Sequence, residues 1–239
     1  MSDTVLIDKT PQAWIYTLNR PGKRNALSAE LVEALIEGVQ AAHAQQVPLL
    51  VFRGAGKNFS AGFDFTGYET QSEGDLLLRM VRIETLLQSV AASPSLTLAL
   101  AHGRNFGAGV DLFAACKLRH CTPDASFRMP GLKFGLVLGS RRLRNLVGAD
   151  RALSILGDAR TFDADEARRI GFVQQVAPEH DWPAQQRQAE QTAAALDAAT
   201  RASLYAALDA NTHDADMAAL VRSAARPGIK TRIQQYLAG

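Results

Sequence analysis

Short apolar runs alternate with longer amphipathic segments along much of the chain, and this alternation predicts a fold of the α/β class. The runs are rich in leucine, β-branched and aromatic side chains, as is typical of buried strands. The first two runs lie on either side of Pro11 and are expected to pair with each other. Strands are predicted at 5–7, 14–18, 49–52, 96–100 and 172–176.

Apolar positions with helical spacing mark the segments between these runs. Leu31, Leu35 and Val39 recur along one face of a helix, and Ser28 before them has a side chain preferred at an N-cap. Further helices are predicted at 76–90, from the capping-box-like sequence 163–166 to Gly171, and over most of the chain from Trp182 onward.

Length and composition bound the domain organisation. A chain of 239 residues, 47% of them hydrophobic, is long enough for one ordinary domain with its own core and a helical appendix. We place a boundary near Leu196, which divides a core domain at 1–196 from a helical module at 197–239. The module is expected to pack on a neighbouring subunit, because it cannot bury its own apolar face alone.

Charge and cysteine content exclude several classes of protein. A net charge of +2 is too small to indicate a nucleic-acid or acidic-membrane partner. Cys116 and Cys121 lack the spacing of a metal site, so we expect reduced structural thiols and no metal. No apolar run has the length of a membrane span, and the opening Met1-Ser2-Asp3 does not resemble a signal region. These features predict a soluble cytoplasmic protein.

Two glycine-bearing turns carry the candidate chemistry. The segments 59–64 and 103–111 each follow a predicted strand, and glycine lets their backbone approach a ligand closely. The second segment leads directly into a helix, so its free N–H groups would point out of the helix N-terminus. Two such turns brought together could offer one N–H each to a single carbonyl oxygen, which is the arrangement of an oxyanion hole.

These turns and their order along the chain resemble the crotonase superfamily, the enoyl-CoA hydratase/isomerase family. The resemblance implies a ββα spiral core, a C-terminal helical oligomerisation module, and assembly into a homotrimer or a hexamer of paired trimers. It also implies an acyl-CoA substrate, with coenzyme A as part of the thioester and no permanently bound cofactor. The resemblance is carried by the stretches 19–27, 60–64, 102–103, 107–112, 116–119, 125–130 and 135–137.

The same resemblance implies roles for individual residues. The backbone amides of Ala61 and Ala108 would form the oxyanion hole. Lys23 and Arg24 would bind the phosphates of coenzyme A, although a solvated loop is the alternative for both. The other residues implied to lie along coenzyme A are Ala26, Leu27, Ala61, Phe63 and Asp64, with Lys57 as a weaker candidate.

Asp111 is the only acid at a position where the family carries a catalytic carboxylate. Hydratases of the family have glutamates at the positions of Asp111 and Gly131, and some isomerases use an acid at the position of Gly139. Hydration needs two proton-transferring groups, whereas one carboxylate can remove a proton and return it elsewhere. Double-bond isomerisation is therefore favoured over efficient hydration. The alternative is a structural Asp111 that caps its helix or pairs with an arginine.

Several basic residues depart from the family pattern. Arg104 and Arg128 either recognise a polar acyl group or are simply exposed. The arginines at 141–144 are expected to form salt links on the surface or between subunits. Structural roles are expected for His102, His120 and His213.

Other functions are compatible with the same scaffold. The missing acids suggest a catalytically degenerate subunit that binds CoA thioesters without converting them. RNA binding is disfavoured, because Glu30, Glu33 and Glu37 make the first helix acidic. Decarboxylation, dehalogenation and carbon–carbon bond hydrolysis also occur on this scaffold, and the sequence does not rank them.

Overall fold

A six-stranded sheet forms the frame of the molecule in the computed structural model, which describes residues 4–239. Its strand order is β1-β2-β3-β4-β6-β9; β1 is antiparallel to β2, and the other pairings are parallel. A smaller sheet has the order β5-β7-β8. The strands are β1 (Val5–Lys9), β2 (Ala13–Leu18), β3 (Leu49–Gly54), β4 (Leu96–Ala101), β5 (Arg104–Phe106), β6 (Leu118–Cys121), β7 (Ser126–Arg128), β8 (Thr161–Asp163) and β9 (Gln175–Val176).

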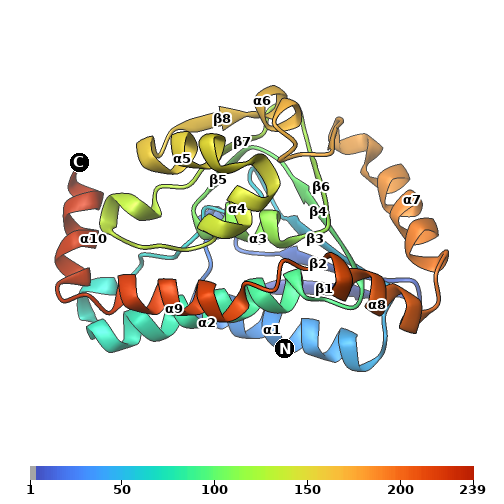
Figure 1. Cartoon of the computed structure of the whole chain (residues 1–239), viewed down its shortest axis with the longest axis horizontal. Helices are drawn as coiled ribbons and strands as arrows, with labels where there is room; N and C mark the ends of the chain where they lie inside the picture. The colour runs from blue at the N-terminus through green and yellow to red at the C-terminus, as the bar shows by residue number, and fades with distance from the viewer. Residues whose placement is uncertain (1–3) are drawn as a thin grey trace.

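Helices cover the large sheet and surround the small one (Figure 1). The predicted N-cap Ser28 accepts a hydrogen bond from the Leu31 amide at 3.3 Å, and Asp163 caps α6 in the same way through Glu166. Gly171 has a φ of +81° just after α6, as the C-cap prediction requires. The helices are α1 (Ala29–Ala44), α2 (Glu73–Ala91), α3 (Ala108–Ala115), α4 (Ser140–Val147), α5 (Ala149–Asp158), α6 (Ala164–Arg169), α7 (Trp182–Ala194), α8 (Ala198–Leu208), α9 (His213–Ala224) and α10 (Ile229–Ala238).

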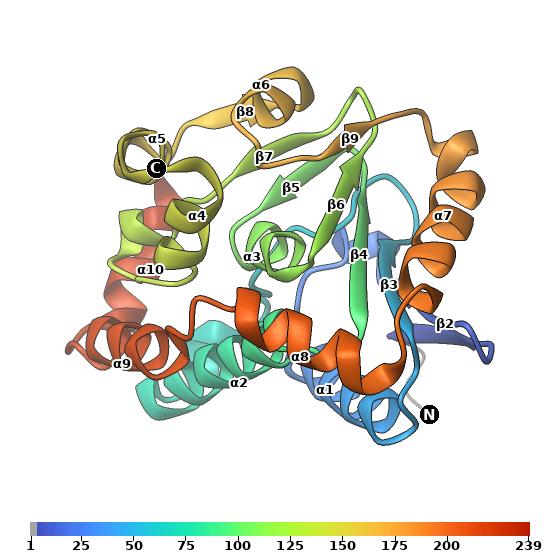
Figure 2. The ribbon, with the colours of Figure 1, turned by 45° about the vertical axis from the view of Figure 1, so that its right-hand side comes forward.

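The central strands are buried on both faces, which explains their nearly continuous apolar sequence. Side chains alternate between the two faces of a strand, so Leu50 and Phe52 join the core that includes α1, whereas Leu49 and Val51 pack with Trp182 of α7. Figure 2 shows α7 running beside β3 and β4. The predicted α/β class is confirmed.

The prediction of a strand at 172–176 is wrong in its length. Phe172 and Val173 are buried in the main core, but only Gln175–Val176 pairs with β6. The Val173 amide instead donates to the Ala167 carbonyl at 3.0 Å, which closes the end of α6. The Gln174 amide donates to the Arg119 carbonyl of β6 at 2.9 Å, so bonding to β6 begins at Gln174.

The C-terminal helices fold back onto their own chain. Leu220, Ile229 and Ile233 are buried in a cluster with Met80 of α2 and Phe134. Figure 1 shows α9 lying along α2 and α10 closing one end of the molecule. The α9 and α10 helices thus find their neighbour in the core domain at 1–196 of the same chain, and packing of the module on another subunit stays a prediction. Each such side chain contributes about 1.5–3 kcal/mol on burial, so these helices stabilise the single chain.

The described part of the chain offers few special groups outside this frame. Cys116 and Cys121 are free and buried, and burial raises the pKa of each thiol to about 12. Within residues 4–239, no helix combines the length and apolar character that a membrane span requires. The same residues contain no cluster of three or more histidine, cysteine or acidic side chains suited to a metal ion.

Candidate active site

The two glycine-bearing turns meet in the folded chain. The Phe106 amide donates to the Ser60 carbonyl at 3.1 Å, so the end of the strand β5 is bonded to the beginning of the first turn. The buried side chain of Asn105 accepts a hydrogen bond from the Ser60 amide at 3.4 Å. Asn105 also donates to the carbonyls of Gly103 and Ser126, and these bonds fix the second turn. The contact that the sequence could only suggest is thus present.

Glycine is required where the turns touch. Gly62 has a φ of +80°, and a Cβ at this position would overlap the Phe106 carbonyl oxygen and lie 3.0 Å from the Ala108 amide nitrogen. A Cβ on Gly109 would lie 2.6 Å from the Ser60 carbonyl oxygen. Real side chains do not approach a backbone so closely, so the two turns can interlock only with glycine at both positions.

We expect Gly62→Ala to destabilise the fold and to separate the two turns. Its added Cβ meets backbone atoms that cannot rotate away, so the free energy of unfolding should fall by at least about 2 kcal/mol more than in a matched control. Gly67→Ala is that control, because Gly67 has a φ of +71° and no atom within 4 Å of an added Cβ. Denaturant unfolding of both variants measures the difference, and equal losses would contradict the close contact.

A third segment, residues 20–27, holds the first turn from the other side. The buried Asn25 side chain donates to the carbonyls of Ala55 and Asn58, both at 2.8 Å. The Leu27 amide donates to the Gly62 carbonyl at 2.7 Å, and the Ala61 amide to the Arg24 carbonyl at 2.8 Å. The Ala61 amide is therefore already bonded within the protein, and the prediction that it is a free oxyanion donor is wrong.

The amides of Phe63 and Ala108 differ from that of Ala61. Ala108 is the first residue of α3, so its N–H has no partner within the helix. In the described part of the chain, neither its amide nor that of Phe63 takes part in a backbone or side-chain hydrogen bond. Gly62, whose Cβ position faces the Ala108 amide, directly precedes Phe63. Sequence reasoning placed Phe63 along coenzyme A but missed its amide, because the bonding partner of each turn residue is set by the distant segment 20–27.

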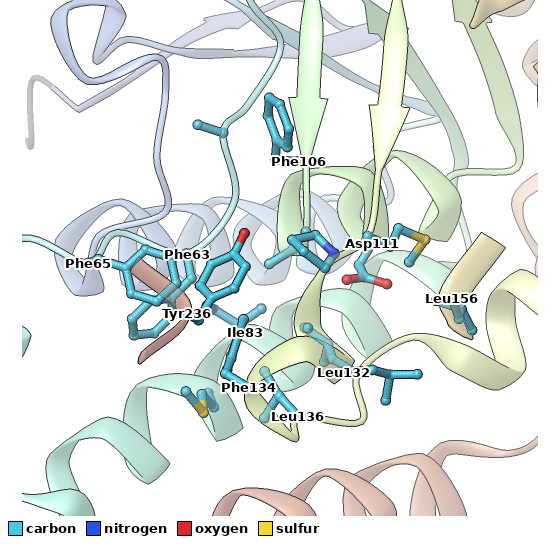
Figure 3. Close-up of a pocket in the computed structure, with 18 of the residues that line it drawn as sticks. Phe63, Phe65, Ile83, Phe106, Asp111, Leu132, Phe134, Leu136, Leu156 and Tyr236 are labelled. Atoms are coloured by element: carbon cyan, nitrogen blue, oxygen red, sulfur yellow. The ribbon is translucent and has the colours of Figure 1, made fainter. Parts of the chain in front are cut away.

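A largely apolar cavity of about 250 Å³ lies against these amides. Figure 3 shows aromatic side chains, including Phe63, Phe65 and Tyr236, grouped together and the carboxylate of Asp111 apart from them. Arg24 and Asp111 are the charged residues of its lining, and Tyr236 reaches it from α10. The remaining lining residues are Ala61, Met80, Ile83, Phe106, Gly107, Ala108, Met129, Pro130, Gly131, Leu132, Phe134, Leu136, Leu138, Ser140, Leu156 and Leu237.

Asp111 lies in the first turn of α3 and is 3% exposed. Its Oδ1 has no hydrogen-bond partner among the described residues, and neither a salt bridge nor a capping bond of its side chain is found there. Burial raises the pKa of Asp111 well above its ordinary value; the positive charge of Arg142 opposes this rise and the negative charge of Glu84 adds to it. Neither structural alternative, a helix cap or an arginine pair, describes this carboxylate.

Gly139 makes room for the Asp111 side chain. It has a φ of +63° at the start of α4, and a Cβ there would overlap Oδ1 of Asp111 and lie 2.7 Å from its Cγ. The space that a side chain at 139 would fill is thus taken by the carboxylate of residue 111. Gly131 also lines the cavity and provides no functional group. Asp111 is consequently the single carboxylate among the described lining residues.

The residues implied to bind coenzyme A fall into two groups. Lys23 and Arg24 are exposed, and Arg24 borders the cavity, whereas Ala26 and Leu27 are buried. Asp64 is held inside the protein: its carboxylate pairs with Arg20 at 2.8 Å. The Asp64 carboxylate also accepts a hydrogen bond from the Thr66 amide. Its backbone amide donates to the Leu27 carbonyl, and its backbone carbonyl accepts from the Arg79 guanidinium.

These contacts change what Asp64 can do. Burial acts to raise the pKa of Asp64, but the hydrogen bonds from Thr66 and Arg20 outweigh it and leave the pKa below its ordinary value. Its backbone amide and carbonyl both have partners in the chain. Asp64 therefore fixes the loop that follows the first turn, and its place along coenzyme A stays a prediction of the resemblance.

The arginines that depart from the family pattern are not part of the cavity lining. Arg104 is exposed on β5, and Arg128 donates from Nε to the Ala159 carbonyl at 2.7 Å. Recognition of a polar acyl group by either residue is thus not supported. Arg142 pairs with the buried Glu84 of the same chain, so a surface or subunit link is the wrong description for it. The histidines have internal partners: His102 with Gly56, His120 with Gln185 and His213 with Asp209.

Sequence reasoning missed three residues near the cavity. Glu84 interrupts the apolar face of α2 between Met80 and Leu87, and an acid at an apolar position of the pattern indicates a buried charge. Arg142 and Tyr236 carried no such signal, because their positions depend on how α4 and α10 pack.

Comparison with known proteins gives a consistent classification. The family described as enoyl-CoA hydratase/isomerase matches residues 13–227. A solved structure from Bordetella parapertussis, named within the same enoyl-CoA hydratase/isomerase group, is 72% identical over all of both chains, with a TM-score of 0.99. The probable enoyl-CoA hydratase of Mycobacterium tuberculosis is 34% identical over 162 residues, which cover 66% of this chain and 65% of the relative.

A third relative is named for a different activity. The mitochondrial Delta(3,5)-Delta(2,4)-dienoyl-CoA isomerase of Rattus norvegicus is 33% identical over 181 residues, 69% of this chain and 55% of that protein. The chain thus spans less than two thirds of the length of these two curated relatives. The family match covers most of the chain and agrees with the meeting of the two turns. This protein belongs to the enoyl-CoA hydratase/isomerase family of the crotonase superfamily.

Proposed function

We propose that this protein converts an acyl-CoA thioester through an enolate, with the amides of Phe63 and Ala108 as the oxyanion hole and Asp111 as the proton carrier. The observation that carries this proposal is the buried carboxylate of Asp111 in an apolar cavity next to two unbonded amides. Donors held ready in a dry site stabilise a developing negative charge by about 3–4 kcal/mol each. A raised pKa makes Asp111 a stronger base than an exposed carboxylate.

Double-bond isomerisation is the reaction that these groups favour. Hydration needs one group for the water and another for the α-carbon. Asp111 is the single carboxylate of the described lining, and Gly131 and Gly139 supply no second acid there. One carboxylate can remove a proton from one carbon and return it to another, so a 3-enoyl-CoA to 2-enoyl-CoA shift needs no further group.

An exchange experiment tests the enolate directly. The protein is incubated with saturated and unsaturated acyl-CoA thioesters in D₂O, and NMR follows deuterium at the carbons next to the thioester and along the double bond. Isomerisation with deuterium incorporation supports the proposal. Hydration of a 2-enoyl-CoA without any shift of the double bond would contradict it.

The alternative is a subunit that binds CoA thioesters without converting them, which the glycines at 131 and 139 motivate. Calorimetry with the same thioesters separates the two. Tight binding together with neither exchange nor turnover on any member of the series favours the alternative. Acyl groups of moderate size are the appropriate series, because the cavity has a volume of about 250 Å³.

Lys23 and Arg24 are proposed to bind the phosphates of coenzyme A. We expect Lys23→Ala and Arg24→Ala each to weaken acyl-CoA binding several-fold, and the effect should shrink at high salt because exposed charges are screened. Arg144→Ala is the control, since Arg144 is an exposed cation on α4 outside the cavity lining. Titration calorimetry at low and high salt measures the effect, and equal affinities in all variants would remove both residues from the site.

Assembly into trimers or hexamers remains part of the proposal. Exposed leucines on α8, Leu204 at 42% and Leu208 at 74%, support a subunit contact there. Light scattering after size-exclusion chromatography tests it, and a monomer at micromolar concentration would contradict it.

A further inference from the structure

A largely buried pair of opposite charges joins the two helices that pack against the helix of Asp111. Glu84 of α2 and Arg142 of α4 form a salt bridge of 3.3 Å between Oε1 and Nη2. The Glu84 side chain is 1% exposed and the Arg142 side chain 12%. Neither residue belongs to the lining of the cavity. The pair is therefore shielded from solvent and does not touch a bound acyl group.

Helix packing brings this pair up to Asp111. The helix α3, which carries Asp111, packs against both α2 and α4. Gly139 at the start of α4 contacts the Asp111 carboxylate, and Arg142 follows three positions later on the same helix face. Both charges act on Asp111, since Arg142 lowers and Glu84 raises the pKa of its carboxyl.

The three groups retain unused hydrogen-bonding capacity. Within the described residues, Oδ1 of Asp111, Oε2 of Glu84 and Nη1 of Arg142 are buried without a hydrogen-bond partner. Glu84 is paired with the Arg142 guanidinium, and both charges act on Asp111 in an interior where charges interact more strongly than in water. The protonation of either carboxyl must then depend on the charge of the other.

We propose that Glu84 and Arg142 are positioning residues that set the proton affinity of Asp111 from outside the cavity. Arg142 favours the ionised form of Asp111, which removes the proton. Glu84 engages the same guanidinium and adds a negative charge, so it makes that carboxylate a stronger base. This inference rests on the proposed function for the part that Asp111 plays in the reaction.

The proposed proton transfer does not change the protonation of Glu84 or Arg142. Asp111 takes a proton from a substrate carbon, and the electrons of that C–H bond move toward the thioester oxygen. The proton then returns from Asp111 to another carbon as the double bond shifts. Glu84 and Arg142 neither gain nor lose a proton in this sequence.

The other charges around the pair have partners of their own. Burial raises the pKa of Glu84, and Asp216 of α9 adds to that rise, but Arg141 holds Asp216 at 3.0 Å. Gln88 donates to Oε1 of Glu84 at 3.0 Å. The N-terminal end of α3 favours a negative Asp111 and is the same in every variant below. Changes at 84 and 142 therefore isolate the effect of the pair.

Single replacements of Glu84 and Arg142 should shift the pKa of Asp111 in opposite directions. Glu84→Gln keeps the shape and removes the negative charge, so the pKa of Asp111 should fall by about one unit or more. Arg142→Gln removes the positive charge, so this pKa should rise, whereas Arg142→Lys should leave it close to that of the unchanged protein. Because the ionised carboxylate is the active form, the acidic limb of the kcat/KM profile should move down in Glu84→Gln and up in Arg142→Gln.

The titration is read without substrate by ¹³C NMR of aspartate-labelled protein, with Asp111 assigned by the signal lost in Asp111→Asn. Glu33→Gln is the matched control, because Glu33 forms an exposed pair with Arg82. This variant should leave the pKa of Asp111 unchanged. Shifts in the same direction for both charge-removing variants, or no shift in folded Glu84→Gln protein, overturn the inference. If the pKa of Asp111 shifts in opposite directions in the two variants but the protein converts no thioester, the inference is supported and the proposed function is contradicted.

Discussion

Asp111→Asn is expected to lower kcat for double-bond isomerisation by about 100- to 10,000-fold, the range that a positioned acid–base group contributes. Asparagine preserves the shape of the side chain but cannot accept the substrate proton. The affinity for the thioester should change little, because the apolar lining and the two amides remain. Stopped-flow or steady-state spectrophotometry measures kcat, and calorimetry measures binding.

Stability separates this outcome from a structural role. Asn at 111 removes a buried carboxylate whose Oδ1 has no partner, so the free energy of unfolding should stay equal or increase. If Asp111 only stabilised the start of its helix, its loss would cost up to about 1 kcal/mol and leave kcat intact. Asp150→Asn is the control, since Asp150 is an exposed acid in the first turn of α5.

Gly139→Ala is expected to reduce kcat nearly as much, by about 100-fold or more, because it displaces the same proton carrier. The added Cβ would overlap Oδ1 of Asp111, so the carboxylate must rotate away from its place in the cavity. Affinity for the thioester should suffer less than kcat, since 139 is not itself a lining residue. Steady-state kinetics separates the two effects.

A matched glycine controls for backbone strain. Gly228 begins α10 with a φ of +83° and has no atom within 4 Å of an added Cβ, so Gly228→Ala carries similar strain without the collision. The double variant Gly139→Ala with Asp111→Asn should be no slower than Asp111→Asn alone, because both changes act on one group. Full activity in Gly139→Ala would show that the position of the Asp111 carboxylate is unimportant.

The sequence predicts the frame of this protein well because its signals are local. Periodicity located the central strands, and Ser28 and Asp163 marked helix starts through bonds that span only three residues. The meeting of the two turns followed from the family resemblance, and glycine chemistry explains it. The bonding state of single amides was not predictable: the Ala61 amide is taken by Arg24, from a loop far away in the sequence.

Long-range packing accounts for the other errors. The apolar face of 197–239 predicted packing on a neighbour but did not identify it, and Leu220 and Ile233 find their contacts on α2 and near Phe134. Arg142 was expected to form a salt link on the surface or between subunits, but α4 turns it toward the buried Glu84 of its own chain. Such pairings depend on how helices from distant parts of the chain meet, and no local pattern encodes them.

The aromatic contacts of α10 link ligand occupancy to local opening of the C-terminal helix. The Tyr236 ring packs at a tilt against Phe65 and Phe134, with ring centroids 6.3 and 5.2 Å apart, and all three residues line the same cavity. An acyl chain that fills the cavity adds contacts that α10 must break before it can open. Amide hydrogen exchange across 229–238 should therefore slow on binding, and it would report occupancy even for a thioester on which the protein performs no chemistry.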